Sequence, residues 1–412
     1  MTRSAYSRRR FLSKILQKGL GTSAFIAGTP SLNSIANICE TAIAAGTLSQ
    51  LIATSPKARY YIAQNDEGNC TSCHDNASFD AKKSPHKNSL SVRCVLCANQ
   101  CLIAPFNRGR CNSRYNDNGI LKTLVYGRPI TTHVDPIEKK PLYHFYPGSL
   151  AYSLATSGCP LRCQFCQNWQ ISQARPEDYN VSYTPPKQIV DNAKTINAPT
   201  IAFTYNEPTV FIEYMTDIAR AARSKGLHSV LISCGYMTKE PLNELCDVLD
   251  AIKIDLKGFS KEFYQKLSQA DLNAVLRSIE QVRKRNRHLE LVNLVIPTQN
   301  DSDAMLKGLA KWIVTYLGRD VPIHFSRFHP DYKLVNLPPT PIATLDRARA
   351  IALSEGIHYA YVGNVPGHPG NNTYCPNCNK VIIERVGFFI KASNLNGNRC
   401  KFCNTQIAGV FS

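Results

Sequence analysis

The sequence predicts an α/β protein whose parallel sheet is flanked on both sides by small cysteine-rich segments. From residue 151 onward, short apolar runs alternate with amphipathic helical stretches. Such alternation implies parallel strands joined by right-handed crossovers, as in a β/α barrel or a doubly wound sheet. Sixteen cysteines, most of them in short-spaced groups, lie before, within and after this region. The chain of 412 residues has room for one large domain and one or two small ones.

The expected elements follow one another in order. Strands are expected at Tyr152–Thr156, Thr200–Tyr205, His228–Ser233, Ala251–Leu256, Leu289–Ile296, Pro322–Phe328 and His358–Val362. Helices are expected at Thr209–Ser224, Lys239–Leu249, Asp271–Asn286, Ala304–Tyr316 and Thr344–Glu355. The helical period is clearest between Phe211 and Ala222, where apolar residues recur every three or four positions.

Changes in composition along the chain give the expected domain boundaries. These are a signal segment (1–44), a linker with a Cys-x-x-Cys-His motif (45–90), a cysteine-rich N-terminal module (91–150), the α/β domain (151–370) and a C-terminal four-cysteine module of zinc-ribbon or rubredoxin-like type (371–412). The net charge of +18 is dispersed, and no basic stripe interleaved with aromatic residues is present. A solvated basic surface is therefore favoured over nucleic-acid binding.

The N-terminal segment has the features of a twin-arginine export signal. Ser7–Lys14 contains consecutive arginines, a weakly apolar stretch follows at Ile15–Ala27, and Ala42–Ala44 offers a small-residue cleavage site. We expect export to the periplasm, with a basic N-terminus on a cytoplasmic protein as the alternative. No transmembrane helix is expected, because no segment combines the necessary length and apolarity.

A second motif near the N-terminus agrees with export. Cys70, Cys73 and His74 have the spacing of a c-type haem attachment site, in which two thiols bond the haem and the histidine ligates iron. A zinc site, ligands of an auxiliary iron–sulfur cluster and unligated thiols are the alternatives.

The most informative motif directly follows the first expected strand. Cys159, Cys163 and Cys166 are separated by three and two residues. Three thiolates from one loop can ligate three corners of a [4Fe–4S] cubane and leave the fourth iron open to a small molecule. A structural zinc loop with a distant fourth ligand is the alternative.

From about Val92 to the C-terminus, the sequence resembles the radical S-adenosylmethionine (SAM) member of the AmmeMemoRadiSam family. That family is related to the activating enzymes of pyruvate formate-lyase and other glycyl radical enzymes. The matching segments are Arg93–Cys97, Asp135–Gly148, Ser157–Gln173, Thr204–Pro208, Lys253–Lys257, His324–Pro330 and Tyr361–Asn364.

The resemblance implies a partial (β/α)6 barrel with the cluster loop after its first strand. SAM would bind the open iron of the cluster, and a low-potential electron donor would reduce that cluster. Reductive cleavage of SAM would then yield a 5′-deoxyadenosyl radical, which takes a hydrogen atom from the substrate. Glycine in a partner protein is the substrate that the resemblance suggests.

The resemblance also assigns SAM contacts after the second strand. Asn206, Glu207 and Pro208 occupy the place of the glycine-glycine-glutamate motif, so Glu207 would receive the SAM ammonium group. Tyr205 and Asn206 replace the two glycines, which changes how closely the backbone can approach SAM. Ser233 and Cys234 stand where activating enzymes usually have an asparagine, so Ser233 is expected to supply that hydrogen bond.

Further contacts are expected at the ends of later strands. Asp255 and Lys257 are two positions apart and so share a face, and they would contact SAM or substrate or form an ion pair inside the barrel. His324 and His329 lie near another strand end and are candidates for SAM or cluster contacts, with a structural role as the alternative.

Two further cysteine groups flank the barrel. Cys375, Cys378, Cys400 and Cys403 form a pair of Cys-x-x-Cys knuckles that suit one tetrahedral zinc, or rubredoxin-like iron. The second group, which is less regularly spaced, suits zinc or an auxiliary cluster, with free thiols as the alternative. It consists of Cys94, Cys97, Cys101 and Cys111.

Catalysis by a radical enzyme is the favoured function. The alternative is a non-catalytic iron–sulfur and haem protein that transfers electrons. A radical enzyme that modifies RNA would fit the positive charge, but the sequence contains no recognisable nucleic-acid module.

Overall fold

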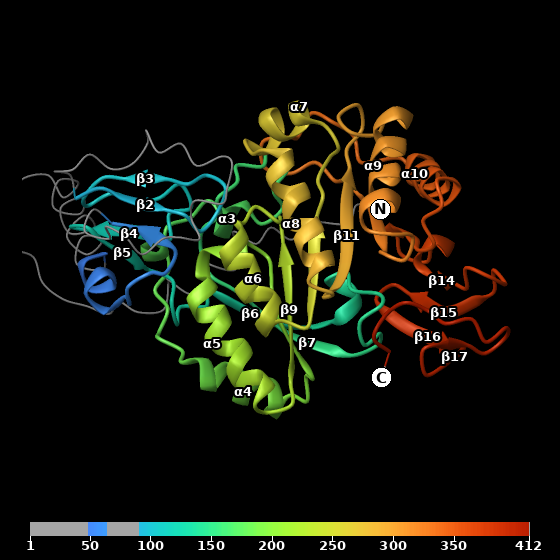
Figure 1. The fold of residues 1–412 in the computed structure, drawn as a ribbon, viewed down its shortest axis with the longest axis horizontal. Coiled ribbons are helices and arrows are strands. Elements are labelled where there is room, and N and C mark those ends of the chain that lie inside the picture. Colours follow the sequence, from blue (N-terminus) through green and yellow to red (C-terminus); the bar gives the residue numbers. More distant parts are fainter. Residues whose placement is uncertain (1–47, 64–89, 412) are drawn as a thin grey trace, which may run out of the picture. The chain divides into compact units, whose positions relative to one another are not determined.

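An eight-stranded sheet forms the centre of the computed structural model, which describes residues 48–63 and 90–411 (Figure 1). Its parallel strands are β7 (Leu150–Ala155), β8 (Thr200–Phe203), β9 (His228–Ser233), β10 (Ala251–Asp255), β11 (His288–Val295), β12 (Ile323–Arg327) and β13 (Ala360–Gly363). These confirm all seven expected strands. Strand β6 (Thr131–Pro136) was not expected, and it pairs antiparallel with β7 at one edge of the sheet.

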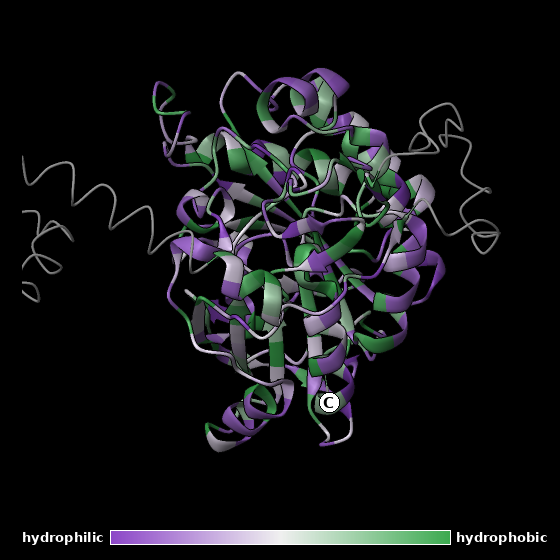
Figure 2. Cartoon of the chain, turned by 90° about the vertical axis from the view of Figure 1, so that its left-hand side faces the viewer, coloured by the Kyte–Doolittle hydropathy of each residue, from purple (hydrophilic) through white to green (hydrophobic). Residues whose placement is uncertain are grey.

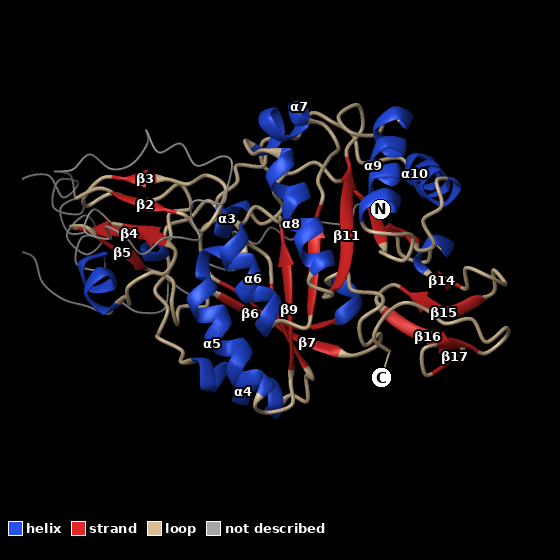
Figure 3. Cartoon of the chain, viewed as in Figure 1, coloured by secondary structure: helices blue, strands red, loops and turns tan. Residues whose placement is uncertain are grey.

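The segments that connect consecutive parallel strands contain helices, and these helices form one layer. The helices are α4 (Pro186–Thr195), α5 (Ile212–Arg223), α6 (Lys239–Val248), α8 (Leu272–Lys284), α9 (Asp303–Tyr316) and α10 (Ile342–Ser354). Contacts join α4 to α5, α5 to α6, α6 to α8 and α9 to α10, and α5 packs on β8 and β9 while α10 packs on β12 and β13 (Figure 3). All five expected helices are confirmed, and α4 is an additional one.

The order of the strands decides between the two expected topologies. The parallel strands lie in chain order from β7 to β13 without a reversal, which excludes the doubly wound sheet. Six consecutive β/α units are present, as the partial (β/α)6 prediction requires. Within the described ranges, β13 and β6 are the two ends of the sheet, so it is an open sheet and not a closed barrel.

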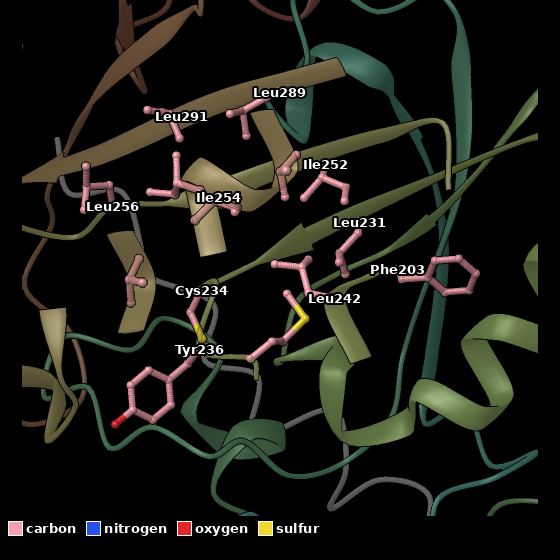
Figure 4. Packing of buried hydrophobic residues seen from close by; sticks show 14 of the residues in the cluster. Phe203, Leu231, Cys234, Tyr236, Leu242, Ile252, Ile254, Leu256, Leu289 and Leu291 are labelled. Atoms are coloured by element: carbon pink, nitrogen blue, oxygen red, sulfur yellow. The ribbon is translucent and has the colours of Figure 1, made fainter. Parts of the chain in front are cut away.

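Apolar side chains fill the space between the sheet and the helices. Phe203, Leu231, Ile252 and Leu291 come from four neighbouring strands and are fully buried (Figure 4). Hydrophilic residues follow the outer sides of the helices (Figure 2). Burial of each such side chain contributes about 1.5–3 kcal/mol, so this core holds the strand ends in fixed positions.

The cysteine-rich segment before the sheet consists of short strands. β1 (Tyr61–Ile62), β2 (Val92–Cys94) and β3 (Leu102–Ile103) pair antiparallel, and β4 (Arg114–Asp117) and β5 (Ile120–Thr123) form a hairpin. The hairpin turns at Asn118 and Gly119, both with positive φ, as a two-residue type I′ turn requires.

The C-terminal cysteine-rich segment is also made of short antiparallel strands. They are β14 (Thr373–Tyr374), β15 (Val381–Val386), β16 (Phe389–Ser393), β17 (Leu395–Asn396) and β18 (Arg399–Cys400). The remaining short elements are η3 (Ile137–Lys139), α3 (Trp169–Ser172), η4 (Pro176–Asp178), η5 (Pro208–Phe211), α7 (Lys261–Phe263), η6 (Tyr264–Ser268) and η7 (Pro369–Asn371).

Two predictions lie outside the described residues. They are the export signal in residues 1–44 and the haem motif of Cys70, Cys73 and His74. Among the helices that the structure does describe, none has the length and apolarity needed to cross a membrane.

Candidate active site

A cavity of about 450 Å³ opens at the carboxyl ends of the parallel strands. Ligands gather at this end of parallel sheets because the loops that follow the strands converge there. Nine of the expected site residues line the cavity: Cys159, Cys163, Cys166, Asn206, Glu207, Ser233, Asp255, Lys257 and His324. The fold thus brings together residues that span more than 160 positions of the sequence.

The cysteine loop after β7 is fixed by backbone hydrogen bonds. The Arg162 and Gln164 amides donate to the carbonyls of Ser268 (3.0 Å) and Leu267 (2.8 Å). The Arg162 guanidinium donates to the Cys159 carbonyl at 2.8 Å. Because main-chain groups on both sides of Cys163 are held, the three thiols keep their relative positions.

The loop begins at a glycine that no other residue can replace without strain. Gly158 has φ +94°, and a Cβ atom there would lie 2.2 Å from both the Cys111 carbonyl oxygen and the Ser113 hydroxyl. The side chain of Ser113 donates to the Ser157 carbonyl at 2.9 Å. The cluster loop therefore packs directly on the N-terminal cysteine-rich segment.

The three thiols need positive charge nearby to become ligands. Burial raises the pKa of Cys159 well above its usual value, and burial also raises the pKa of Cys163. The Lys257 ammonium opposes this increase at Cys163. Metal ligation requires the thiolate form, so the positive charge of bound iron would offset the remaining cost of burying the thiolate charges. A cubane with one free iron fits three such thiols on one loop.

The carboxylate of Glu207 is held in one orientation by its neighbours. It accepts hydrogen bonds from the hydroxyls of Thr209 (2.5 Å) and Ser233 (2.8 Å) and from the Cys234 amide (2.7 Å). Only 2% of Glu207 is exposed. Its neighbour Asn206 donates to the Gly158 carbonyl at 2.8 Å, whereas its Oδ1 is buried and has no partner among the described residues. The pair offers an oriented anion and a free acceptor, which fit an ammonium group.

Charged side chains on β10 and just after it also line the cavity. Asp255 contacts Lys253, and Lys257 Nζ lies 3.2 Å from Asp255 Oδ2. Burial would raise the pKa of Asp255, but the two lysines outweigh it and lower the pKa to about 2. Asp255 and Lys257 thus form the expected ion pair, and both residues also line the cavity. Lys253 was missed, although its spacing of two from Asp255 places it on the same face.

The charged pair of Lys140 and Asp135 was also not assigned a role from the sequence. Lys140, which lines the cavity, lies 2.5 Å from Asp135, and Asp135 accepts a hydrogen bond from the Tyr205 hydroxyl at 2.6 Å. Burial lowers the pKa of Lys140 to about 8. Both charged residues belong to a segment that matched the resembled family, so the signal was in the sequence without an assigned role.

The two histidines are placed differently. His324 lines the cavity, but its Nε2 lies 2.8 Å from the buried Glu290 carboxylate, and its ring stacks on Tyr361. His329 is exposed and is not among the residues that line the cavity, so the fold does not bring it together with the other expected site residues, and its contact with SAM or the cluster stays a prediction. The reason is local, because the preceding Phe328 is fully buried and the chain turns His329 outward.

The C-terminal cysteines form a compact four-sulfur site. The ligand atoms of Cys375, Cys378, Cys400 and Cys403 all lie within 4.8 Å of one another. Cys375 and Cys400 each accept a backbone hydrogen bond from the residue four positions later, which gives two equivalent knuckles. This geometry suits a single tetrahedral ion and no larger centre.

The chain also matches known protein families and proteins. The model of the Radical SAM superfamily matches residues 153–308. An uncharacterized protein of Methanocaldococcus jannaschii is 46% identical over 318 residues, which cover 77% of this chain and 95% of that protein.

More distant relatives are activating enzymes. The pyruvate formate-lyase-activating enzyme of Listeria monocytogenes is 24% identical over 181 residues (41% of this chain, 71% of that enzyme). The pyruvate formate-lyase 1-activating enzyme of Escherichia coli K12 is 23% identical over 209 residues (47% and 85%). The narrower resemblance to the AmmeMemoRadiSam family stays a prediction. The matched model, the relatives and the cysteine loop at the strand ends together identify this chain as a member of the radical SAM superfamily.

Proposed function

We propose that the chain is a radical enzyme that binds a [4Fe–4S] cluster on Cys159, Cys163 and Cys166 and SAM beside it. The observation that carries this proposal is the convergence of three loop thiols and an oriented carboxylate on one cavity. When bound and reduced, the cluster and SAM supply a 5′-deoxyadenosyl radical that can take a hydrogen atom from carbon.

The residues of the cavity have distinct tasks in this function. Glu207 and the free Oδ1 of Asn206 bind the SAM ammonium group. Lys253 and Lys257 offer positive charge to the SAM carboxylate or the substrate, and Asp255 holds both lysines in position. The metal identity at the C-terminal four-cysteine site is proposed to be zinc.

The wall of the cavity also excludes water. Leu161, Phe165, Ile232, Val292 and Leu294 contribute apolar surface around the polar groups. Water excluded by these side chains cannot screen the charged groups of the cavity, so their hydrogen bonds and ion pairs with a bound ligand are strengthened.

We further propose a protein as substrate, with a glycine residue as the site of hydrogen abstraction. The similarity to pyruvate formate-lyase-activating enzymes supports this. So does the hairpin between β15 and β16, whose residue Phe388 lines the cavity. Val386, Phe388 and Phe389 are 56%, 40% and 72% exposed. Exposed apolar residues beside a cavity are typical of surfaces that bind a partner chain.

Anaerobic SAM cleavage tests the proposed function. Iron-loaded protein with a low-potential reductant is expected to release 5′-deoxyadenosine, and Cys163→Ala is expected to lower the rate at least 100-fold. Cys246→Ala is the matched control, because Cys246 is a buried cysteine on α6 outside the cavity. A fully loaded wild-type protein that releases no 5′-deoxyadenosine would contradict the proposal and favour non-catalytic electron transfer.

The location of the enzyme is a separate proposal. The twin-arginine segment Ser7–Lys14 supports export to the periplasm. Cell fractionation with antibody detection tests it, and recovery in the cytoplasm alone, with the N-terminus uncleaved, would contradict it.

A further inference from the structure

The N-terminal cysteine-rich segment brings four thiols to one cavity. Cys94 ends β2, Cys97 and Cys101 lie on the connection to β3, and Cys111 precedes β4. The Cys94 amide donates to the Cys101 carbonyl at 3.0 Å, which fixes two of the ligands relative to each other. All four residues line the same cavity, together with Arg114.

The spacing of these thiols differs from that of the C-terminal site. Across residues 48–63 and 90–411, the C-terminal cysteines are the only group of three or more potential ligands whose atoms all lie within 4.8 Å of one another. No three of the N-terminal thiols therefore approach as closely as ligands of one zinc ion, which sit about 2.3 Å from the metal. Among the described residues, the catalytic trio of Cys159, Cys163 and Cys166 is likewise not part of such a compact group. Four thiols that line one cavity beside a buried cation can ligate the four irons of a cubane cluster.

A buried cation faces this cavity with an unused donor. Arg114 is fully buried, and its Nη2 donates to Glu213 Oε1 and Oε2 at 2.8 and 2.9 Å. Its Nη1 donates to the Arg59 carbonyl at 2.8 Å, whereas its Nε is buried without a partner among the described residues. A buried donor without a partner costs about 1–3 kcal/mol. Sulfur atoms of an anionic thiolate-bound cluster would accept this N–H, and the guanidinium charge would offset the cluster charge.

The cavity adjoins the catalytic loop. Pro160, which directly follows Cys159, lines the four-thiol cavity. Its carbonyl accepts hydrogen bonds from Asn99 Nδ2 at 2.9 Å and Arg110 Nε at 3.1 Å, and Asn99 lies between Cys97 and Cys101 in the chain. The residue after Cys159 is therefore joined by one hydrogen bond to Arg110, which is adjacent to Cys111, and by another to Asn99, which is two positions from Cys97 and Cys101. Either route is a short path for an electron.

We propose that Cys94, Cys97, Cys101 and Cys111 hold an auxiliary [4Fe–4S] cluster that relays single electrons to the catalytic cluster. A low-potential flavoprotein or ferredoxin-type donor reduces the auxiliary cluster by one electron. That electron then passes to the catalytic cluster, so the first is oxidised as the second is reduced, and no bond or proton is transferred. The relay rests on the proposed function, whereas the presence of the auxiliary cluster does not.

Labile sulfide tests the auxiliary cluster without reference to catalysis. The variant Cys159→Ala/Cys163→Ala/Cys166→Ala, loaded anaerobically with iron and sulfide, is expected to retain about four iron and four sulfide per chain. Its reduced form is expected to show an electron paramagnetic resonance (EPR) signal that does not change when SAM is added. Further substitution of Cys97→Ala and Cys101→Ala should remove both the sulfide and the signal. Zinc without sulfide in the triple variant would overturn the proposal.

The wild-type chain gives the same answer if the variants do not fold. Reduced wild-type protein is expected to show two EPR components, of which SAM changes one. A single component that SAM changes completely would overturn the auxiliary cluster.

The relay has its own measurement. Cys97→Ser is expected to lower 5′-deoxyadenosine release at least tenfold when the protein donor is the reductant, and to retain it with dithionite. Equal rates with both reductants would overturn the relay. Failure of wild-type protein to cleave SAM would refute the proposed function, while the sulfide result would stand.

Discussion

At the scale of single residues, the site depends on a few atoms that have no freedom to move. Gly158 is the clearest example, because its backbone angle and the absent Cβ atom let the cluster loop touch the Cys111 carbonyl. Glu207 is similar, since three side-chain and backbone donors hold its carboxylate toward the cavity. Gly158 joins the cysteine loop to the N-terminal cysteine-rich segment, and Glu207 fixes a negative charge in the cavity, so substitutions at either residue should change cofactor binding.

Gly158→Ala is expected to destabilise the protein by roughly 2–4 kcal/mol, because a strained φ angle and a steric clash add together. Gly226→Ala is the matched control, with φ +72° and no atom within 4 Å of the added Cβ. It should cost only the strain, about 1–2 kcal/mol. Chemical denaturation and iron content after loading measure both effects. Equal losses in the two variants would show that the contact with Cys111 is unimportant.

At the scale of elements, the C-terminal segment docks through buried polar groups. His144 Nδ1 lies 2.6 Å from the Ala408 carbonyl oxygen and its Nε2 lies 2.5 Å from the Tyr361 hydroxyl. Burial lowers the pKa of His144 from 6.5 to about 4. The nearby Glu290 carboxylate opposes this decrease without cancelling it. The docked form therefore requires a neutral imidazole.

Acid is expected to loosen this docking. Because the folded pKa is lower than the unfolded pKa, the contribution of His144 is complete above pH 6.5 and is lost as the pH falls toward 4. The free energy of unfolding should decrease by roughly 3 kcal/mol over that window from this group. Denaturant titrations at several pH values measure the slope. His144→Phe should flatten it, whereas the exposed control His133→Gln should not, and an unchanged slope in His144→Phe would contradict this account.

The elements also show what sequence patterns can predict. The strands of the parallel sheet were predicted because short stretches rich in apolar residues alternate with amphipathic helical stretches along the chain. Strand β6 was missed because Thr131–Pro136 is polar and half exposed, as an edge strand can be. Helix α4 was missed because it starts at Pro186 and has a polar composition.

At the scale of the whole molecule, the sequence predicted which residues gather at the strand ends but not how each is used. Glu290 and His324 lie on neighbouring strands and are 34 positions apart in the sequence, so the contact between them could be recognised only from the sheet register. Likewise, the sequence separations of the cysteines do not show that the two four-cysteine groups differ in the kind of metal centre they suit. Only the positions of their ligand atoms separate a compact site from a wide one.

The central claim is that three thiols leave one iron of the catalytic cluster free for SAM, which Glu207 helps to bind. EPR of the reduced, anaerobically loaded protein tests it most directly. Addition of SAM is expected to change the signal of the catalytic cluster, and Glu207→Gln should need roughly 10–100 times more SAM for the same change. Glu244→Gln, which alters a carboxylate outside the cavity, should respond like wild type. A fully loaded catalytic cluster whose signal does not respond to SAM at any concentration would contradict the account.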